Sequence, residues 1–159
     1  MHPDARALAD RLRLLPHPEG GFYREVFRSA RRVSTPRGVR SALTVIHYLL
    51  PAGAFSALHR VEADEVWTHA GGDPLDVHLL DGAGGHEFFR LGAGGPTEAV
   101  VPAGTWQAAR PRGERFALAT CAVAPGFEFS DLELADERLL AATSRELAGL
   151  VRSLLRRAG

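Results

Sequence analysis

The sequence lacks the features that mark several large classes of protein. Cys121 is the only cysteine among 159 residues, which excludes an intrachain disulfide and a zinc site built from thiolates. No apolar run approaches the ~20 residues that a membrane helix requires. The start, Met1-His2-Pro3-Asp4, has no basic-then-apolar secretion pattern. We therefore expect a cytoplasmic protein with no membrane partner.

An excess of charge of one sign is also missing. Lys and Arg together number 19, and Asp and Glu together number 19, so the formal net charge is zero. Proteins that bind nucleic acid usually carry an excess of basic residues for the phosphates. The sequence also has no Gly-x-x-x-x-Gly-Lys, no Gly-x-Ser-x-Gly and no Cys-x-x-Cys motif. We expect no nucleic-acid partner and a site that uses none of these motifs.

Glycine and proline, in contrast, are plentiful, and they divide the chain into short segments. These segments are rich in β-branched and aromatic residues and recur at a spacing of roughly 8–12 residues, which is typical of a sandwich or barrel. We predict one domain over residues 1–159, with an all-β barrel over about 20–130, a loop over 31–40 and a hairpin turn over 81–85. The predicted strands cover 22–29, 41–50, 54–61, 65–70, 76–80, 87–91, 97–101, 106–110 and 116–124.

Helices are predicted only at the two ends of the chain. Residues 4–15 have leucines at helical spacing and stop at Pro16. Residues 136–157 form the predicted C-terminal helical segment, in which Thr143-Ser144-Arg145-Glu146 fits a capping box. An apolar stripe follows this box. We expect the stripe to pack on the barrel or on a second copy of the chain.

Residues 53–72 hold the densest group of side chains that can act in a site. His59, Glu65, Trp67 and His69 fall within one predicted strand, turn and strand. Because side chains alternate along a strand, Glu65, Trp67 and His69 share one face. A neutral imidazole near a carboxylate can abstract a proton, since the carboxylate stabilises the imidazolium. This group is the first candidate for a functional site.

The spacing within this stretch resembles the first motif of the cupin superfamily. That motif is a glycine, five residues, His-x-His, three or four residues, a glutamate, six residues and a glycine, matched here by Gly53, His59, Glu65 and Gly72. The segment 102–107, Pro-Ala-Gly-Thr-Trp-Gln, is similar to the latter half of the second cupin motif.

More narrowly, the chain resembles one RmlC-like cupin subfamily of uncharacterised function. This resemblance implies a double-stranded β-helix, or jelly-roll barrel, with a short N-terminal helix and a C-terminal helix, a pocket along its axis and a homodimer. The residues that carry it are His-Pro-Glu-Gly-Gly-Phe-Tyr-Arg-Glu (17–25), Ser-Ala-Leu-His-Arg-Val (56–61), Asp-Glu-Val-Trp (64–67), Gly-Asp-Pro-Leu (72–75), Val-Pro-Ala-Gly-Thr-Trp (101–106) and Ala-Pro-Gly-Phe-Glu-Phe (124–129).

Two positions depart from the metal-binding pattern of the superfamily. The resemblance implies ligands at His59 and Glu65, but Val61 occupies the second histidine position and Gln107 the histidine position of the second motif. Valine donates no lone pair, and a neutral amide oxygen suits hard cations better than iron, zinc or nickel. We expect no cofactor, and the alternative is a divalent metal held by His59, Glu65, His69 and Gln107.

The resemblance also implies how such a pocket works without a metal. Nucleotide-sugar epimerases of the superfamily use a histidine base and a tyrosine acid. On that basis the predicted catalytic residues are His59, Glu65 and Tyr23. Tyr23 and Tyr48 are the only tyrosines, and Tyr23 is preferred because it lies in the block 17–25.

Five further side chains are predicted to contact the ligand. Trp67 is suited to stack on a ring, and His69 and Gln107 share the inward faces of their strands. Arg24 and Glu25 are adjacent, so they point to opposite faces of one strand. An inward Glu25 adds a carboxylate to the pocket, whereas an inward Arg24 adds an anchor for anions. The sequence leaves this choice open.

Three functions remain in view. The first is a pocket for a small polar molecule, such as a sugar or a carboxylate, with metal-free isomerase, epimerase or lyase-type proton transfer. The second is a non-catalytic binding or storage-like cupin. The third is a metal-dependent enzyme with a degenerate site. A fold alone does not choose between them, so whether the protein is an enzyme stays open.

Overall fold

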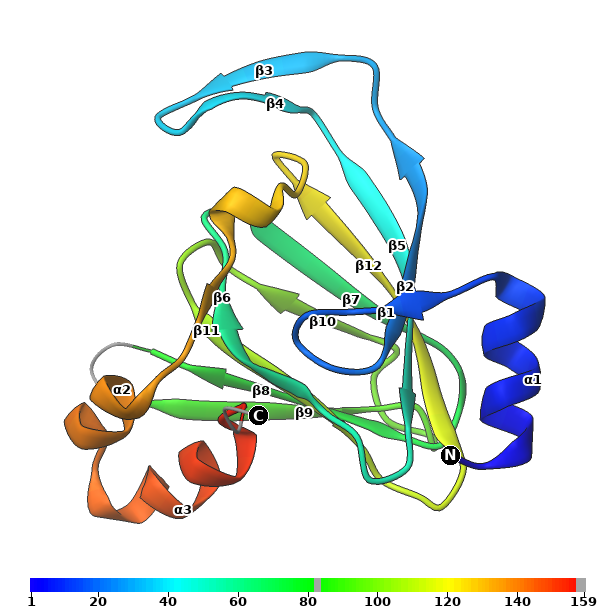
Figure 1. Ribbon diagram of the computed structural model, residues 1–159. Coiled ribbons are helices and arrows are strands. Elements are labelled where there is room, and N and C mark those ends of the chain that lie inside the picture. The colour runs from blue at the N-terminus through cyan, green and yellow to red at the C-terminus, as the bar shows by residue number, and fades with distance from the viewer. Residues whose placement is uncertain (82–83, 157–159) are drawn as a thin grey trace.

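The computed structural model describes residues 1–81 and 84–156, and Figure 1 shows a barrel of antiparallel strands with helices at its sides. The predicted all-β class is confirmed. In chain order the elements are α1 (Pro3–Leu12), β1 (Leu15–Pro16), β2 (Phe22–Arg28), β3 (Arg32–Thr35), β4 (Gly38–Ser41), β5 (Thr44–Pro51), β6 (Ser56–Arg60), β7 (Asp64–Gly72), β8 (Leu75–Leu80), β9 (His86–Leu91), β10 (Glu98–Val101), β11 (Trp106–Pro111), β12 (Phe116–Ala124), a 3-10 helix (Phe129–Asp131), β13 (Glu133–Leu134), α2 (Glu137–Ala142) and α3 (Arg145–Leu154).

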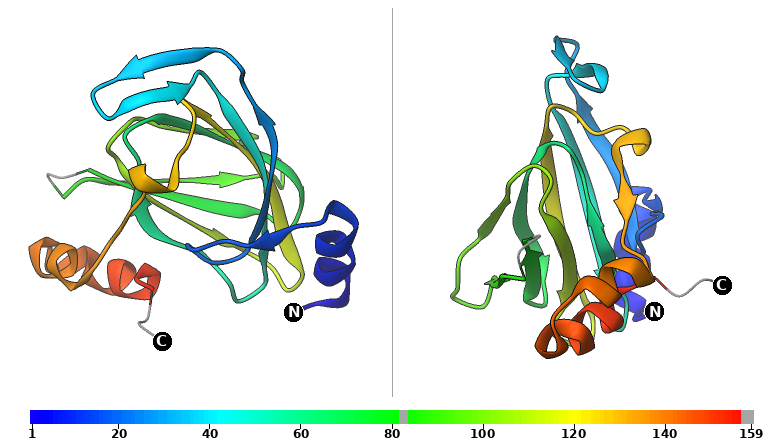
Figure 2. Two further views of the ribbon diagram at one scale, coloured as in Figure 1. Left: turned by 45° about the horizontal axis from the view of Figure 1, so that its top comes forward. Right: turned by 90° about the vertical axis from the view of Figure 1, so that its left-hand side faces the viewer.

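Two sheets form the barrel. One has the strand order β1-β2-β5-β12-β7-β10 and the other has the order β13-β6-β11-β8-β9. Strands β5, β12 and β7 pair along nearly their whole lengths, and they form the middle of the first sheet. The sheets face each other across the barrel interior (Figures 1 and 2). Side chains on the inner faces therefore make up the core, and any site in the barrel must be cut out of that core.

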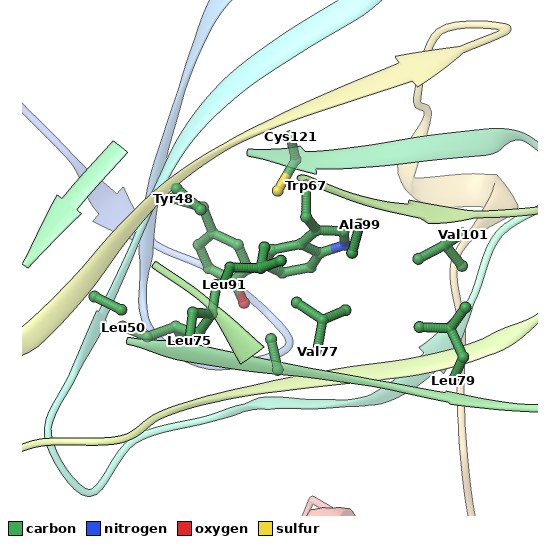
Figure 3. Packing of buried hydrophobic residues seen from close by; sticks show 13 residues of the cluster. Tyr48, Leu50, Trp67, Leu75, Val77, Leu79, Leu91, Ala99, Val101 and Cys121 are labelled. Atoms are coloured by element: carbon green, nitrogen blue, oxygen red, sulfur yellow. The ribbon is translucent and has the colours of Figure 1, made fainter. Parts of the chain in front are cut away.

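The core between the sheets combines large and small side chains. Ala117, Ala119 and Cys121 occupy alternate, buried positions of β12. These small residues leave room for Tyr48 and Trp67, whose rings lie 5.5 Å apart at a tilt of 41°. Figure 3 shows these two rings filling the centre of the cluster. Small residues on β12 and large rings on the neighbouring strands thus fill this part of the interior.

The segment predicted to be a loop over 31–40 is instead a hairpin. Strands β3 and β4 pair from Arg32↔Ser41 to Thr35↔Gly38. Val33 and Val39 on this hairpin are exposed, and its one buried residue is Ser41 at the end of β4, so the segment has no alternation of buried and exposed residues that a sequence pattern could reveal. Figure 2 shows the hairpin standing away from the body of the barrel.

The C-terminal segment predicted over 136–157 is two helices, and residue 157 lies outside the described residues. Helix α3 begins after Ser144, whose side chain makes no capping bond, so the predicted capping box does not form. Val151 and Leu154 of α3 are fully buried in a second apolar cluster that includes Leu58 and Trp106. The stripe therefore packs on the barrel. Among the described residues, no helix has the length and apolar character to cross a membrane.

The loop between β1 and β2 folds into the barrel, because two glycines allow a very close approach. Gly20 and Gly21 have φ angles of 115° and 67°. A Cβ atom at Gly21 would lie 2.6 Å from the carbonyl oxygen of Leu49. The Ala57 N–H donates to the carbonyl oxygen of Glu19 at 2.9 Å, so this loop continues the hydrogen bonding of β6. The turn places the Glu19 side chain inside the barrel.

This close approach predicts an unequal cost for two alanine substitutions. Gly53 has φ of 81°, similar to that of Gly21, but nothing lies within 4 Å of its Cβ position. Both Gly21→Ala and Gly53→Ala pay a left-handed backbone cost of about 1 kcal/mol. Gly21→Ala adds an overpacking cost of about 2 kcal/mol. Urea unfolding should show this difference in the free energy of unfolding, and equal losses in the two variants would contradict the close approach.

Candidate functional site

A cavity of about 350 Å³ lies in the barrel interior, and its lining includes Arg28 and Thr44, at the ends of β2 and β5 that lead into the hairpin. Its volume is at the small end of the range for small-molecule pockets, ~300–1,000 Å³. Strands β2, β5, β6, β7 and β12 supply its walls, together with the β1–β2 loop and the segment after β12. The lining residues are Leu15, His17, Glu19, Tyr23, Arg24, Glu25, Arg28, Thr44, Ile46, Tyr48, His59, Val61, Glu65, Val123, Phe127, Glu128 and Phe129.

His59 lies at the floor of the cavity with one ring nitrogen committed and the other open. Its Nδ1 atom is 2.7 Å from the carbonyl oxygen of Ala57. A carbonyl oxygen only accepts, so Nδ1 carries the proton and Nε2 keeps its lone pair. No described residue hydrogen-bonds Nε2. This atom is also not one of the fully buried polar atoms that lack a partner, so it is accessible from the cavity. The ring is thus held as a base that faces the cavity.

Glu19 lies behind His59 and is nearly enclosed. One carboxyl oxygen, Oε2, accepts a hydrogen bond of 2.8 Å from the Ser56 hydroxyl and is 3.4 Å from Nδ1 of His59. The Tyr48 hydroxyl is 3.5 Å from the same oxygen, but its shorter bond, 2.8 Å, goes to the carbonyl oxygen of Gly20. Glu19 therefore connects β5, β6 and the β1–β2 loop at one point.

Glu65 approaches the cavity from β7. Its Oε2 atom accepts a hydrogen bond of 2.6 Å from the Gln107 side-chain amide. The Oε1 atom of that amide accepts one of 2.7 Å from the Trp67 indole N–H. The Cys121 thiol is a further, weak donor to Glu65. This chain ties β7 to β11, and so ties the two sheets together across the interior.

Burial sets the protonation states of these groups. Desolvation raises the pKa of Glu19 to about 8, against the opposing hydrogen bonds from Ser56 and Tyr48. It raises the pKa of Glu65 to about 6, partly opposed by His59. Desolvation lowers the pKa of His59. At neutral pH the floor of the cavity therefore holds a protonated Glu19, a neutral His59 and a largely ionised Glu65.

The structure brings several of the predicted site residues together. His59, Glu65, Tyr23 and Glu25 line one cavity. In the register of β2 with β5, Tyr23 is opposite Tyr48 and Glu25 is opposite Ile46. Tyr48 and Ile46 both line the cavity, so Tyr23 and Glu25 point inward.

Arg24 borders the same cavity but has the opposite orientation. It pairs with His47, which does not line the cavity and sits between the inward positions 46 and 48. The Arg24 side chain is therefore on the outer face of the sheet. Of the two alternatives that the sequence left open, the register favours an inward Glu25.

Three predicted ligand contacts lie elsewhere. Trp67 is 1% exposed and packs in the core behind the cavity, and Gln107 is fully buried beside it. His69 is on the same face of β7 but four residues beyond Glu65, which is about 13 Å along a strand. Its Nε2 atom is 3.0 Å from the carbonyl oxygen of Asp73, and its ring packs against Gly92.

The donor set does not fit the metal site that the superfamily pattern implies. Val61 lines the cavity where the second histidine would be. Both ends of the Gln107 amide are engaged, by Trp67 and by Glu65. His69 is bonded elsewhere, so the alternative donor set is not gathered. Within the described ranges, no group of three or more His, Cys, Asp or Glu side chains has the placement of a metal site.

Sequence reasoning did not select Glu19, His17 or Tyr48 as site residues. His17 is buried against Tyr23, with ring centroids 4.6 Å apart and planes at 89°. Desolvation lowers the pKa of His17 to about 4, so it is neutral as well. One feature of the sequence could have indicated that Glu19 lies inside the barrel, namely the pair Gly20-Gly21 directly after it. Glycine lets the chain turn into the barrel at positions where a Cβ atom would clash with neighbouring atoms.

The fold is that of a cupin barrel, and its cavity is lined by buried titratable groups. A model of the Cupin_5 family, described as "Cupin superfamily (DUF985)", matches residues 6–135. The chain therefore belongs to this family, and the resemblance drawn from the sequence is confirmed. A search of curated proteins returned no match.

Solved structures agree with this assignment. Protein SO0799 from Shewanella oneidensis is 31% identical with a TM-score of 0.87, and the match covers 99% of each chain. A hypothetical protein from Leishmania major is 29% identical with a TM-score of 0.86, covering 96% of this chain and 99% of that one. Oxalate decarboxylase from Bacillus subtilis is 20% identical with a TM-score of 0.59, covering 87% and 34%, and shares the fold alone.

The raised pKa of Glu19 predicts a pH-dependent stability. The pKa of Glu19 is about 8 in the folded protein, against a usual 4.5, so the folded state keeps a proton that the unfolded state has lost. Stability must then fall as pH rises through this range. The shifts of His17 and Glu65 act at pH 6.5 and below. Between pH 6.5 and 8 we expect the free energy of unfolding to fall by about 1–2 kcal/mol.

Two variants test the assignment of this pH dependence. Glu19→Gln should remove the decline between neutral and mildly alkaline pH, because an amide does not ionise. Glu25→Gln, which changes an exposed carboxylate, should keep it. Urea unfolding at a series of pH values measures both. A decline that persists unchanged in Glu19→Gln would assign the effect to another group.

Proposed function

We propose that the cavity binds a small organic molecule and that His59 moves a proton on it without a metal ion. The observation that carries the proposal is the open Nε2 atom of a neutral, almost fully buried histidine at the floor of a ligand-sized cavity. A base with a lowered pKa is unprotonated at neutral pH and is ready to accept a proton from a bound molecule.

The two neighbouring carboxyl groups suit this transfer. When Nε2 of His59 accepts a proton, the ring becomes an imidazolium cation in a water-poor cavity. Glu65, which is largely ionised at neutral pH, stabilises that cation. The carbonyl oxygen of Ala57 sets the tautomer that leaves Nε2 free, and the carboxyl group of Glu19 lies on the same side of the ring, 3.4 Å from Nδ1. The residues therefore divide into a base and two groups that set its orientation and charge.

Tyr23 is the candidate for returning the proton. It lines the cavity, and no described residue hydrogen-bonds its hydroxyl. The Tyr48 hydroxyl, in contrast, is already bonded to Gly20 and approaches Glu19. A base and an acid on different walls suit removal of a proton from a carbon and its return from the other side, as in an epimerase. Isomerases and lyases share with it only the removal of the proton by a base. The homodimer and the cytoplasmic location stay predictions.

Solvent hydrogen exchange tests the proposal without knowledge of the product. Sugars, hydroxy acids and amino acids incubated with the protein in heavy water should include a compound that gains one mass unit by mass spectrometry. His59→Gln should slow this exchange by about 100-fold, which is the lower range for general-base catalysis. Tyr23→Phe should reduce net turnover more than exchange, since it leaves the base in place.

The matched control is His86→Gln, which changes a histidine on β9 that does not line the cavity. This variant should exchange at the rate of the unchanged protein. Binding of a compound without any exchange would support the non-catalytic alternative, a binding or storage-like cupin. Exchange that survives His59→Gln would contradict the assignment of the base.

A further inference from the structure

The ionisable groups around the cavity are strongly unbalanced in charge. Four carboxyl groups line it, and the one inward-facing guanidinium among the lining residues belongs to Arg28. Arg28 donates two hydrogen bonds to Glu25 and one to Glu128, at 2.8 to 2.9 Å, and a fourth to the carbonyl oxygen of Phe127 at 3.0 Å. The positive charge of Arg28 is therefore already paired with carboxylates of the protein. An anionic ligand would find no free cation on the inner face of this wall.

Glu65 is short of partners at the floor of the cavity. It is 7% exposed and accepts one strong hydrogen bond, from neutral Gln107, with the weak Cys121 thiol nearby. No lysine or arginine of the described chain forms an ion pair with it. A buried carboxylate without a counter-charge is costly. A cation or a strong hydrogen-bond donor on the ligand would offset that cost.

The Nε2 atom of His59 is a second hydrogen-bond acceptor at the floor of the cavity that has no donor among the described residues. His59 is 2% exposed, and this atom lines the cavity as a hydrogen-bond acceptor without a donor. The floor therefore presents two acceptors, a carboxylate and an imidazole nitrogen. A group with several N–H bonds satisfies both, and a carboxylate or phosphate satisfies neither.

The wall nearer the surface is aromatic. Phe129 is 50% exposed and lies 6.3 Å from Tyr23, 6.0 Å from His17 and 5.1 Å from Phe127, measured between ring centroids. Aromatic faces attract cations as well as apolar groups. The cavity thus combines an apolar and aromatic wall with an acidic, acceptor-rich floor.

We propose that the ligand is a small organic cation, an amine on an apolar or aromatic body, whose ammonium group pairs with Glu65. This inference rests on the proposed function, because it takes the cavity as the binding site. It replaces the neutral sugar or anionic carboxylate predicted from the sequence with a positively charged class of ligand.

Three compounds of the same shape test the charge preference. Benzylamine, benzyl alcohol and benzoate differ only in the head group and are small enough for the cavity. By calorimetry at mildly alkaline pH, benzylamine should bind about tenfold more tightly than benzyl alcohol, equivalent to about 1.4 kcal/mol. Benzoate should bind more weakly than the alcohol.

Variants assign the preference to one residue. Glu65→Gln should weaken benzylamine binding about tenfold and leave benzyl alcohol binding unchanged, because only the charged ligand loses a partner. Glu62→Gln, which changes an exposed carboxylate outside the cavity, is the control and should change neither. Circular dichroism would confirm that both variants are folded.

The outcomes separate this inference from the proposed function. Tighter binding of benzoate than of benzylamine would overturn the charge class, even if hydrogen exchange still depends on His59. Equal loss of amine and alcohol binding in Glu65→Gln would overturn the ion pair. If none of the three compounds binds at millimolar concentration, the inference fails for ligands of this size. If no compound exchanges either, the proposed function fails with it.

Discussion

The amide of Gln107 holds the interior of this barrel together. It accepts from Trp67 and donates to Glu65, so one neutral side chain pairs with a buried indole and gives a buried carboxylate its one strong hydrogen bond, both on the opposite sheet. Breaking such a network leaves unpaired groups that cost more than the bonds themselves contribute. The bridge also fixes the position of Glu65 at the edge of the cavity. Glu65 therefore lies where the packed core ends and the cavity begins.

Desolvation then gives the open space its chemistry. The same burial that raises the pKa of Glu19 and Glu65 lowers that of His59 and His17. Each group is pushed towards its neutral form, and only Glu65, with a donor from Gln107, remains largely charged at neutral pH. The result is a base and a neutral acid within 3.4 Å of each other, an arrangement that would not persist in water.

The sequence predicted the barrel well because its strands alternate and its turns are marked by glycine and proline. The family resemblance, rather than these local rules, grouped Tyr23 with His59 and Glu65, and all three line the cavity. Local rules failed for residues whose orientation depends on contacts between segments distant in the sequence. Glu19 is inside because Gly20 and Gly21 allow the loop to touch strands distant in sequence. The outward turn of Arg24 follows from the register of β2 with β5, which no local pattern contains.

His69 shows that a shared face of a strand is not enough to bring a residue into the site. It does share a face of β7 with Glu65, but Trp67 lies between them and belongs to the core. The superfamily arrangement brings several ligands to one point, whereas here Val61 and Gln107 stand at two of those positions and His69 is bonded to the carbonyl oxygen of Asp73. The negative charge of Glu65 must then be balanced by a proton, by an imidazolium or by the ligand. A cavity that keeps this carboxylate ionised at neutral pH, with a neutral histidine beside it, is suited to a ligand that supplies the missing positive charge.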